Sequence, residues 1–196
     1  MTATSLRVEP LVARHLAGWR ALFDACTCTC FCRYWHFAGD KNAWLDRAAH
    51  RPDESFDEHA ADVTAGDPRA SGVVALDGDD VVGWMKVAPR AVMGKLRSLP
   101  VYRATDLGDD EGVWSIGCFL VAPSHRGTGV ARALLEGGAS FARARGARVL
   151  EAYPRRSADA LGEHEVWQGP LGLFESAGFE VYAQAHPPYP VLRRPA

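Results

Sequence analysis

Apolar residues along this chain recur with two distinct spacings, which separate the predicted helices from the predicted strands. Over residues 13–26 and 128–146 they fall three or four positions apart, the spacing of an amphipathic helix. Residues 71–76 and 81–90 are β-branched runs on either side of an Asp-Gly turn, a pattern typical of a β-hairpin. The run over 113–123 is apolar on both faces, which predicts a central strand.

The weaker patterns complete an alternating order of strands and helices. They predict a strand over 5–11, helical material over 42–66 broken near Pro52, a short helix within 88–112, a strand over 147–154, a short helix and a strand over 170–184, and an edge strand over 188–195. The order β-α-α-β-β-(α)-β-α-β-α-β-β predicts an α/β fold with a mixed sheet, and we expect residues 1–196 to form one domain.

Composition excludes several classes of function. With 47% hydrophobic residues the chain can bury a core, and a formal net charge of -2 gives no basic footprint for nucleic acid. No apolar run approaches the roughly 20 residues that cross a bilayer, and the first ten residues lack the basic and apolar regions of a secretion signal. We therefore expect a soluble cytoplasmic protein that binds neither nucleic acid nor a membrane.

A glycine-containing turn connects the central strand to the helix that follows. After Pro123 the chain reads Ser-His-Arg and then Gly127-Thr128-Gly129, directly before the helical pattern. A helix N-terminus has unpaired N–H groups and the positive end of the helix dipole, and glycines let an anion approach that backbone. Arg126 adds a fixed cation. The turn therefore predicts a phosphate-binding site.

Two known phosphate-binding patterns were compared with this turn: one does not fit it, and the other fits it only in part. A P-loop requires Lys-Ser or Lys-Thr after the glycines, and neither follows, so that pattern is excluded. A dinucleotide-binding turn requires G-x-G-x-x-G or A directly after the strand, but Arg132 occupies the sixth position. Glu151 does stand where a ribose-binding acid would lie. A dinucleotide-binding module therefore stays open as an alternative.

The stretch VAPSHRGTGVARALL resembles motif A of the GNAT superfamily of N-acetyltransferases, and LFESAGFEV resembles that superfamily's C-terminal signature. The resemblance covers roughly residues 70–185 and is closest to a bacterial subgroup. It implies a mixed sheet of six to seven strands flanked by about four helices, with a splayed parallel pair of strands. Ser124 departs from the pattern, because Arg or Gln usually begins the motif.

The resemblance also implies which residues bind acetyl-CoA. The strand before the turn would offer main-chain groups of Phe119, Leu120 and Val121 to the pantetheine arm. The N–H groups that would hold the diphosphate are those of Arg126, Gly127, Thr128, Gly129, Val130 and Ala131. The following strand, Val149 to Tyr153, would diverge and open a slot for pantetheine.

The implied reaction is attack of an amine on a thioester, which requires a base or a water relay to take a proton. We expect Glu111 to be that base, acting through water, with a solvated surface acid as the alternative. Family members often use a tyrosine to protonate the leaving thiolate, but that position is Phe174 here. Tyr153 or Cys118 could substitute, or the thiolate could leave without an acid.

Aromatic residues in the segment over 34–44 are expected to overlie the acceptor site. Tyr34 and Trp35 are the candidates there, and Trp84 and Trp114 are expected to line the floor. An aromatic pocket near Asp109, Asp110 and Glu111 would favour an amine with an apolar or cationic body.

Four cysteines lie at alternate positions in CTCTCFC: Cys26, Cys28, Cys30 and Cys32. In an extended segment their thiols would share one face and could bind a metal. Zinc sites use C-x2-4-C pairs instead, so we expect no metal and no disulfide framework, and we interpret the thiols as apolar packing beside the acceptor site.

These observations predict an acetyl-CoA-dependent N-acetyltransferase that transfers an acetyl group directly to a primary amine, expected to be a small molecule. The lack of a hydroxyl at Phe174 leaves a non-catalytic acyl-CoA-binding sensor as the alternative. A homodimer is a further expectation.

Overall fold

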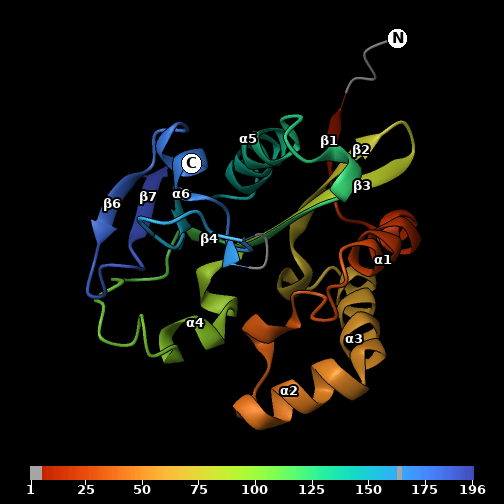
Figure 1. Cartoon of the computed structure of the whole chain (residues 1–196), viewed down its shortest axis with the longest axis horizontal. Coiled ribbons are helices and arrows are strands. Elements are labelled where there is room, and N and C mark those ends of the chain that lie inside the picture. Colours follow the sequence, from red (N-terminus) through yellow and green to blue (C-terminus); the bar gives the residue numbers. More distant parts are fainter. Residues whose placement is uncertain (1–5, 163–164) are drawn as a thin grey trace.

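The structure is a computed structural model that describes residues 6–162 and 165–196, so Ser5, the first residue of the predicted strand over 5–11, lies outside it. The described residues form a seven-stranded sheet in the order β1-β2-β3-β4-β5-β7-β6 (Figure 1). The strands are β1 Arg7–Pro10, β2 Gly72–Asp77, β3 Asp80–Pro89, β4 Val113–Val121, β5 Val149–Ala152, β6 Glu180–Ala183 and β7 Val191–Pro195. All neighbouring strands pair antiparallel except β4 and β5.

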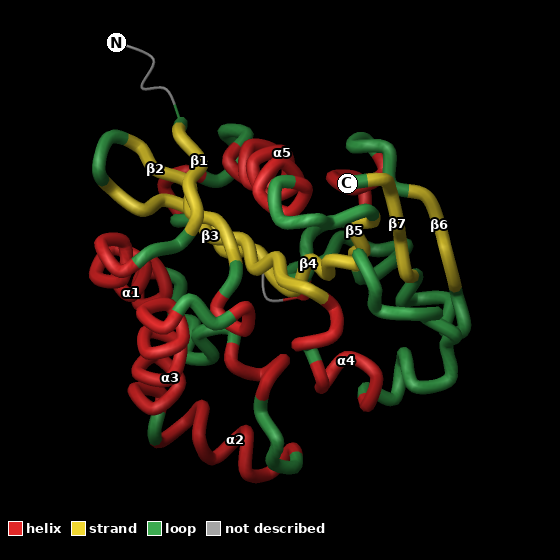
Figure 2. The backbone as a smooth tube through the Cα atoms, turned by 180° about the vertical axis from the view of Figure 1, so that it is seen from behind, coloured by secondary structure: helices red, strands yellow, loops and turns green. Residues whose placement is uncertain are grey.

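Helices cover both faces of the sheet (Figure 2). The described α-helices are α1 Leu16–Ala25, α2 Lys41–His50, α3 Pro52–Ala65, α4 Gly94–Ser98, α5 Val130–Arg143 and α6 Leu171–Glu175. Helix α5 packs across β1, β2 and β3, while α1 packs on the other face of β3 and α3 lies beyond it. This mixed sheet with one parallel pair confirms the predicted fold class.

Helix α5 forms because its apolar residues share one face. Val130, Leu134, Leu135 and Ala139 are buried against the sheet, whereas the predicted stripe member Phe141 is only half-buried. Its ring packs edge-on against Trp114, 5.9 Å away. The chain leaves the helix through Gly146, whose φ of 87° is left-handed and favours glycine.

The two parallel strands separate soon after they pair. Val113, Trp114 and Ser115 pair with the β5 residues Val149–Glu151, and the pairing stops there. On its other edge β4 keeps pairing with β3 as far as Val121, with an irregularity at Lys86/Val87 that leaves Gly117 without a partner. The C-terminal half of β4 therefore has one edge that no β5 residue pairs.

The C-terminal strand is not an edge strand, contrary to the prediction for 188–195. Strand β7 lies between β5 and β6 and pairs with both. The prolines do not prevent this, because Pro188 and Pro190 precede the first paired residue and Pro195 is the last. The edge strand is β6, which exposes Val181 and Tyr182.

Candidate active site

The glycine turn adopts a conformation that its residue types dictate. Strand β4 leads through the short 3-10 helix η5, Pro123–His125, into Gly127 and Gly129, whose φ angles are 72° and 93°. An L side chain rarely adopts these angles, and a Cβ on either glycine would meet nothing within 4 Å. The glycines are therefore required by the backbone conformation rather than by crowding, and the space beside them is open.

Side chains fix the turn, while three of its main-chain amides donate to no described residue. The Thr128 hydroxyl donates to the His125 carbonyl at 2.6 Å, and Arg126 Nε donates to the Val121 carbonyl at 3.2 Å. Among the hydrogen bonds of residues 6–162 and 165–196, none starts from the main-chain amide of Gly127, Thr128 or Gly129. These amides lie at the N-terminus of α5, where donors and the helix dipole attract an anion. The arrangement fits a diphosphate.

The edge of β4 beyond the separation point differs from the expectation. The Phe119 N–H donates to the carbonyl of Trp167 at 2.7 Å, and the Val121 carbonyl accepts from Arg126 and from the Cys26 thiol. An unpaired strand edge needs a hydrogen-bond partner, and the segment before α6 supplies one. The expectation that Phe119 and Val121 offer these groups to pantetheine stays a prediction, and a ligand there would have to displace the Trp167 carbonyl.

A buried polar network lies where β4 and β5 separate. Glu151 is fully buried and accepts from Arg90 Nη1 at 3.0 and 3.1 Å and from Arg193 Nε at 2.6 Å. The Tyr153 hydroxyl donates to Glu151 and lies 2.6 Å from the Ser115 hydroxyl. Because these carboxylate oxygens are all engaged inside the protein, Glu151 cannot bind the ribose of a dinucleotide.

Tyr153 is committed to this network rather than to a ligand. Its ring is fully buried, and burial together with the neighbouring Glu151 raises the pKa of its hydroxyl well above the usual value. The hydroxyl keeps its proton, but that proton is directed at Glu151. The structure thus gives Tyr153 a positioning role between the two strands.

Glu111 does not lie near the turn. Its side chain is 84% exposed and pairs with Arg148 at 3.1 Å, at the closed end of the β4–β5 pair. The nine-residue strand β4 lies between Glu111 and the turn, a span of about 30 Å at ~3.3 Å per residue. The structure therefore supports the alternative of a solvated surface acid.

The second candidate acid, Cys118, is also unavailable, and Phe174, at the position of the usual tyrosine, has no hydroxyl. Phe174 is fully buried, and its ring packs against Phe119 and Phe179 at centroid distances of 6.0 and 5.2 Å. The Cys118 sulfur is buried and lies against the sulfur of Cys32, so it faces the core and not a ligand.

The cysteine segment is not extended. Thr27, Phe31 and Cys32 have φ angles of 50°, 41° and 53°, so the chain turns repeatedly after α1. Cys32 is buried beside Trp84, whereas the sulfurs of Cys28 and Cys30 lie 3.5 Å apart. The four sulfurs therefore do not share one face, and no group of three or more metal-ligating side chains occurs among the described residues.

Of the four predicted acceptor-site aromatics, Trp35 lines one of the two cavities described below, and Tyr34, Trp84 and Trp114 line neither of them. Trp84 is fully buried, and its Nε1 donates to Cys32 Sγ at 3.1 Å. Trp114 is buried on the opposite, α5-facing side. Tyr34 packs on Trp35 and Trp44 at 6.0 and 5.3 Å. The assignments of Trp84 and Trp114 to the pocket floor are wrong, because both rings fill the core.

The acidic loop residues do not reach the aromatic segment either. Asp110 pairs with Arg90 and with Arg97 at 2.5 and 2.8 Å, and the Asp109 carbonyl accepts from Arg90. These arginines hold the acidic loop against the Glu151 network. The expected attraction of a cationic acceptor by this loop therefore has no support in the structure.

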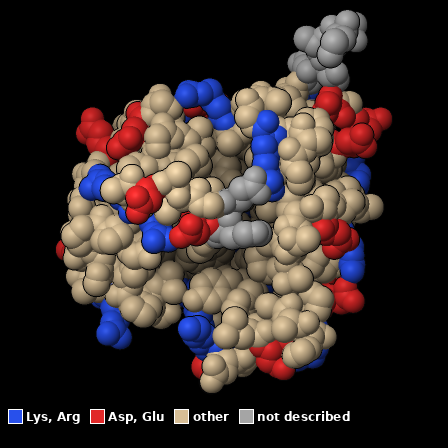
Figure 3. Space-filling model, viewed as in Figure 1, with Lys and Arg blue, Asp and Glu red and all other residues tan. Residues whose placement is uncertain are grey.

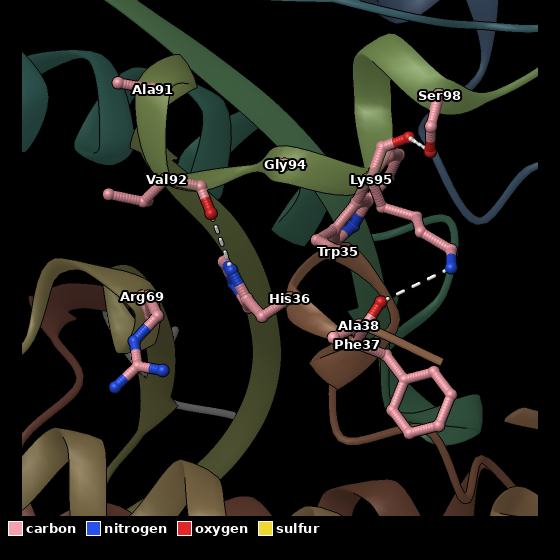
Figure 4. Close-up of a pocket in the computed structure, with 10 residues that line it drawn as sticks. All are labelled: Trp35, His36, Phe37, Ala38, Arg69, Ala91, Val92, Gly94, Lys95 and Ser98. Carbon is pink, nitrogen blue, oxygen red and sulfur yellow. Dashed lines mark hydrogen bonds between the residues drawn. The ribbon is translucent and has the colours of Figure 1, made fainter. Parts of the chain in front are cut away.

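Two adjoining cavities lie beside Trp35. The first, about 390 Å³, is open to solvent, and we call it the Trp35 cavity; it is lined by Trp35, His36, Phe37, Ala38, Arg69, Ala91, Val92, Gly94, Lys95 and Ser98 (Figure 4). The second, about 460 Å³, shares His36, Phe37, Ala38 and Arg69 with it and adds Arg33, Gly39, Arg47, Glu58, Ala61 and Asp62; we call it the Arg47 cavity. The Trp35 ring separates the first cavity from β4, since its Nε1 lies 2.8 Å from where a Cβ on Gly117 would be.

Buried basic groups surround these cavities, and the sequence analysis missed them. Lys86 on β3 is fully buried, donates to the Arg69 carbonyl at 2.6 Å, and has a pKa lowered to about 7 by burial and by Arg33. A single lysine inside the apolar run VVGWMKVAP was the available signal. Nothing comparable in the sequence marked Arg47 or His36.

Charged residues of both signs are interspersed over the face seen in Figure 3, around a recess near its centre. No helix among residues 6–162 and 165–196 combines the length and apolar character needed to cross a membrane.

Comparisons with known proteins point to one family. The family model described as acetyltransferase (GNAT) family matches residues 32–164. The PaiA N-acetyltransferase of Thermoplasma acidophilum, solved with coenzyme A, is 9% identical, with 98% of this chain and 99% of that chain covered and a TM-score of 0.57. YncA of Salmonella typhimurium, a putative acetyltransferase solved with acetyl-CoA, is 16% identical, with 97% and 93% covered and a TM-score of 0.54. The GNAT domain of PAT from S. lividans is 17% identical, with 97% and 90% covered and a TM-score of 0.53. No curated protein matches.

Proposed function

This chain belongs to the acetyltransferase (GNAT) family, and from that premise we propose that it transfers an acetyl group from acetyl-CoA directly to the amine of a small molecule. Two of the similar structures were solved with coenzyme A or acetyl-CoA, and members of the family use acetyl-CoA. The observation that carries the proposal is that the main-chain amides of Gly127, Thr128 and Gly129, just before α5, donate to no described residue.

Acetyl-CoA supplies an activated acetyl group, whose C–S bond breaks as a C–N bond forms to the acceptor and the amine proton leaves with solvent or the thiolate. The chain's part begins with the turn, where the amides of Gly127–Gly129 would hold the diphosphate. Open space beside the glycines fits this group, because no Cβ and no neighbouring atom fills it. Arg126 adds a positive charge beside it.

The separated edge of β4 would then orient the pantetheine arm. This step requires the Trp167 carbonyl to leave the Phe119 N–H, which exchanges one hydrogen bond for another. The Glu151 network holds the two strands in their separated arrangement, since Tyr153, directly after β5, contacts Ser115 on β4. The acceptor would approach from the side of Trp35, whose ring packs against the unpaired Gly117 of β4.

We assign neither a protein base nor a protein acid to the transfer. Glu111 lies at the far end of β4, and Phe174 has no hydroxyl. A thiolate of coenzyme A is a stable leaving group, so water can serve for both proton transfers.

The test measures thiol release from acetyl-CoA over a panel of amines, together with the shift in melting temperature produced by acetyl-CoA and by NAD. A ligand that binds only the folded protein raises the melting temperature, and we expect acetyl-CoA alone to do so. Amine-dependent thiol release supports the transferase. A shift with NAD but none with acetyl-CoA would overturn it.

A non-catalytic acyl-CoA sensor is the second candidate, and two features favour it. Phe174 stands at the position of the usual acid, and the Trp167 carbonyl already accepts a hydrogen bond from the Phe119 N–H. Tight binding of acetyl-CoA without turnover of any amine would favour the sensor. The homodimer and the single-domain organisation over 1–196 stay predictions.

A further inference from the structure

Two thiols of the cysteine segment, residues 26–32, are in contact near the surface of the protein. The sulfurs of Cys28 and Cys30 lie 3.5 Å apart, and both side chains are partly exposed. Thr27 and Thr29, on either side of Cys28, are exposed, so the turn lies at the surface. The proposed acetyl transfer uses neither thiol, and this contact is therefore available for a different chemistry.

The other cysteines of the segment have contacts elsewhere. Cys26 Sγ donates to a main-chain carbonyl at the end of β4, at 3.6 Å. The sulfur of Cys32 is buried against that of Cys118. Cys28 and Cys30 can therefore react with each other without breaking either of these contacts.

The backbone holds the two thiols at a separation that a disulfide can span. The Cys28 N–H donates to the Phe23 carbonyl at 2.9 Å, and the Cys30 carbonyl accepts from the Arg33 N–H at 2.9 Å. Residues two positions apart have Cα atoms at most about 7 Å from each other, and disulfides join Cα atoms roughly 4.4–6.8 Å apart. The sulfurs have to approach from 3.5 Å to about 2 Å, a change that side-chain rotation can provide.

The contact also gives the two thiols different proton affinities. The hydrogen bond with Cys30 lowers the pKa of Cys28 to about 7, against the opposing effect of burial. The same hydrogen bond, together with burial, raises the pKa of Cys30 well above its usual value. Near neutral pH about half of Cys28 is therefore the nucleophilic thiolate, while Cys30 keeps its proton and donates it to that sulfur.

We propose that Cys28 and Cys30 form a redox-active dithiol that a hydroperoxide oxidises to a disulfide, with Cys28 as the attacking thiol and Cys30 as the resolving thiol. The Cys28 thiolate attacks one oxygen of hydrogen peroxide: an S–O bond forms, the O–O bond breaks, and hydroxide leaves and takes a proton from solvent. The Cys30 thiol then attacks the sulfur of this sulfenic acid: an S–S bond forms, the S–O bond breaks, and water leaves with the Cys30 proton. Two electrons pass from the two thiols to the peroxide.

The experiment maps the disulfide in the full chain. The protein is reduced, freed of reductant and treated with equimolar hydrogen peroxide near neutral pH, and the remaining thiols are blocked with N-ethylmaleimide. Trypsin leaves all four cysteines of the segment in one peptide, 21–33, which is sequenced by mass spectrometry. We expect this peptide to lose the mass of two hydrogen atoms, to carry the label at Cys26, and to give no backbone fragments between Cys28 and Cys30. Dithiothreitol should restore both thiols.

Variants assign the two roles. Cys30→Ala removes the resolving thiol, so the sulfenic acid at Cys28 should persist and be captured by dimedone. Cys28→Ala removes the attacking thiol, so the dimedone label should be lost from the segment. Cys26→Ala is the matched control, because Cys26 is also partly exposed and lies two residues from Cys28; the disulfide should form in it as in the wild type. An unchanged thermal unfolding transition shows that each variant is folded.

The outcomes decide this inference whether or not acetyl-CoA binds. A reversible disulfide that maps to Cys28 and Cys30, and that is lost in Cys28→Ala and in Cys30→Ala, supports it. The inference is overturned if peroxide leaves both thiols free to be labelled, or if the bonds that form join only Cys26, Cys32 or Cys118. Oxidation of Cys28 to the sulfinic acid without a disulfide in the wild-type protein also overturns it, because Cys30 then does not act as the resolving thiol.

Discussion

Lys86 places an ammonium group inside the sheet, and its replacement by methionine should change how stability depends on pH. Its Nζ is fully buried and donates to the Arg69 carbonyl at 2.6 Å. Burial first, and Arg33 second, lower its pKa from 10.5 to about 7, although Asp62 and Asp67 oppose this shift. The folded protein therefore releases this proton about 3.5 pH units before the unfolded chain does.

The sign of the effect follows from proton binding. Between the folded and unfolded pKa values the unfolded chain binds one more proton, so the free energy of unfolding rises with pH. At about 1.4 kcal/mol per unit, Lys86 costs roughly 4–5 kcal/mol at pH 7 and below, and about 2 kcal/mol of that cost disappears between pH 7 and 9. Below pH 6 both states are protonated, and the pH dependence from Lys86 vanishes.

The assay is urea unfolding of the wild-type protein and of Lys86→Met at pH 6, 7, 8 and 9. Methionine keeps most of the aliphatic stem and removes the titration, while losing the hydrogen bond to Arg69, a constant cost of about 1 kcal/mol. The difference between the two proteins should change by about 2 kcal/mol in favour of the wild type from pH 7 to 9. Lys41→Met, at an exposed position at the start of α2, is the control and should show a constant difference. A difference that is equally constant for Lys86→Met would refute the reasoning.

Three further predictions concern the candidate site. Gly129→Glu should abolish the melting shift produced by acetyl-CoA, because it puts a negative charge at the diphosphate turn. Gly129→Ala costs the same backbone strain of ~1 kcal/mol at φ 93° without the charge, so it should keep part of the shift. Equal behaviour of the two variants would contradict this. Glu111→Gln should leave kcat within about twofold of wild type, since the carboxylate is exposed at the closed end of β4, and a loss of about 100-fold would restore it as the base. The pKa of Cys28 is lowered to about 7, chiefly by its hydrogen bond with Cys30, so its alkylation by iodoacetamide should reach half its maximal rate near pH 7. The rate is measured by mass spectrometry with Cys28→Ser as the control. A midpoint at the ~8.5 of an ordinary thiol would show that the contact does not form.

Local patterns in the sequence determined much of the fold. The spacing of apolar residues predicted α1 and α5, and the Asp-Gly turn predicted the β2–β3 hairpin, all of which the structure contains. The helical break at Pro52 separates α2 from α3 as predicted. These features depend on periodicity and turn chemistry within a few residues, which a sequence displays directly.

The position of the glycine turn was likewise visible in the sequence. Gly127 and Gly129 have the positive φ angles that explain their residue type, and α5 begins at Val130 directly after them. A strand, a turn and a helix in this order place unpaired amides at one point whatever the rest of the chain does.

Only the tertiary structure decided which partners the residues of the site contact. The carbonyl of Trp167 reaches Phe119, Cys32 reaches Cys118, and Trp84 and Trp114 enter the core instead of a pocket. Strand β7 lies inside the sheet because it pairs with β6, the strand just before it in the chain, on one edge and with the more distant β5 on the other.

The buried groups around the two cavities show the same limit most clearly. Arg47 and His36 belong to no motif, and they come together at these cavities only because α2, α3 and α4 converge there. Sequence determines local conformation through sterics and periodicity over a few residues. Burial, pairing and pKa depend on which distant segments meet, and that is determined by the free energy of packing the whole chain.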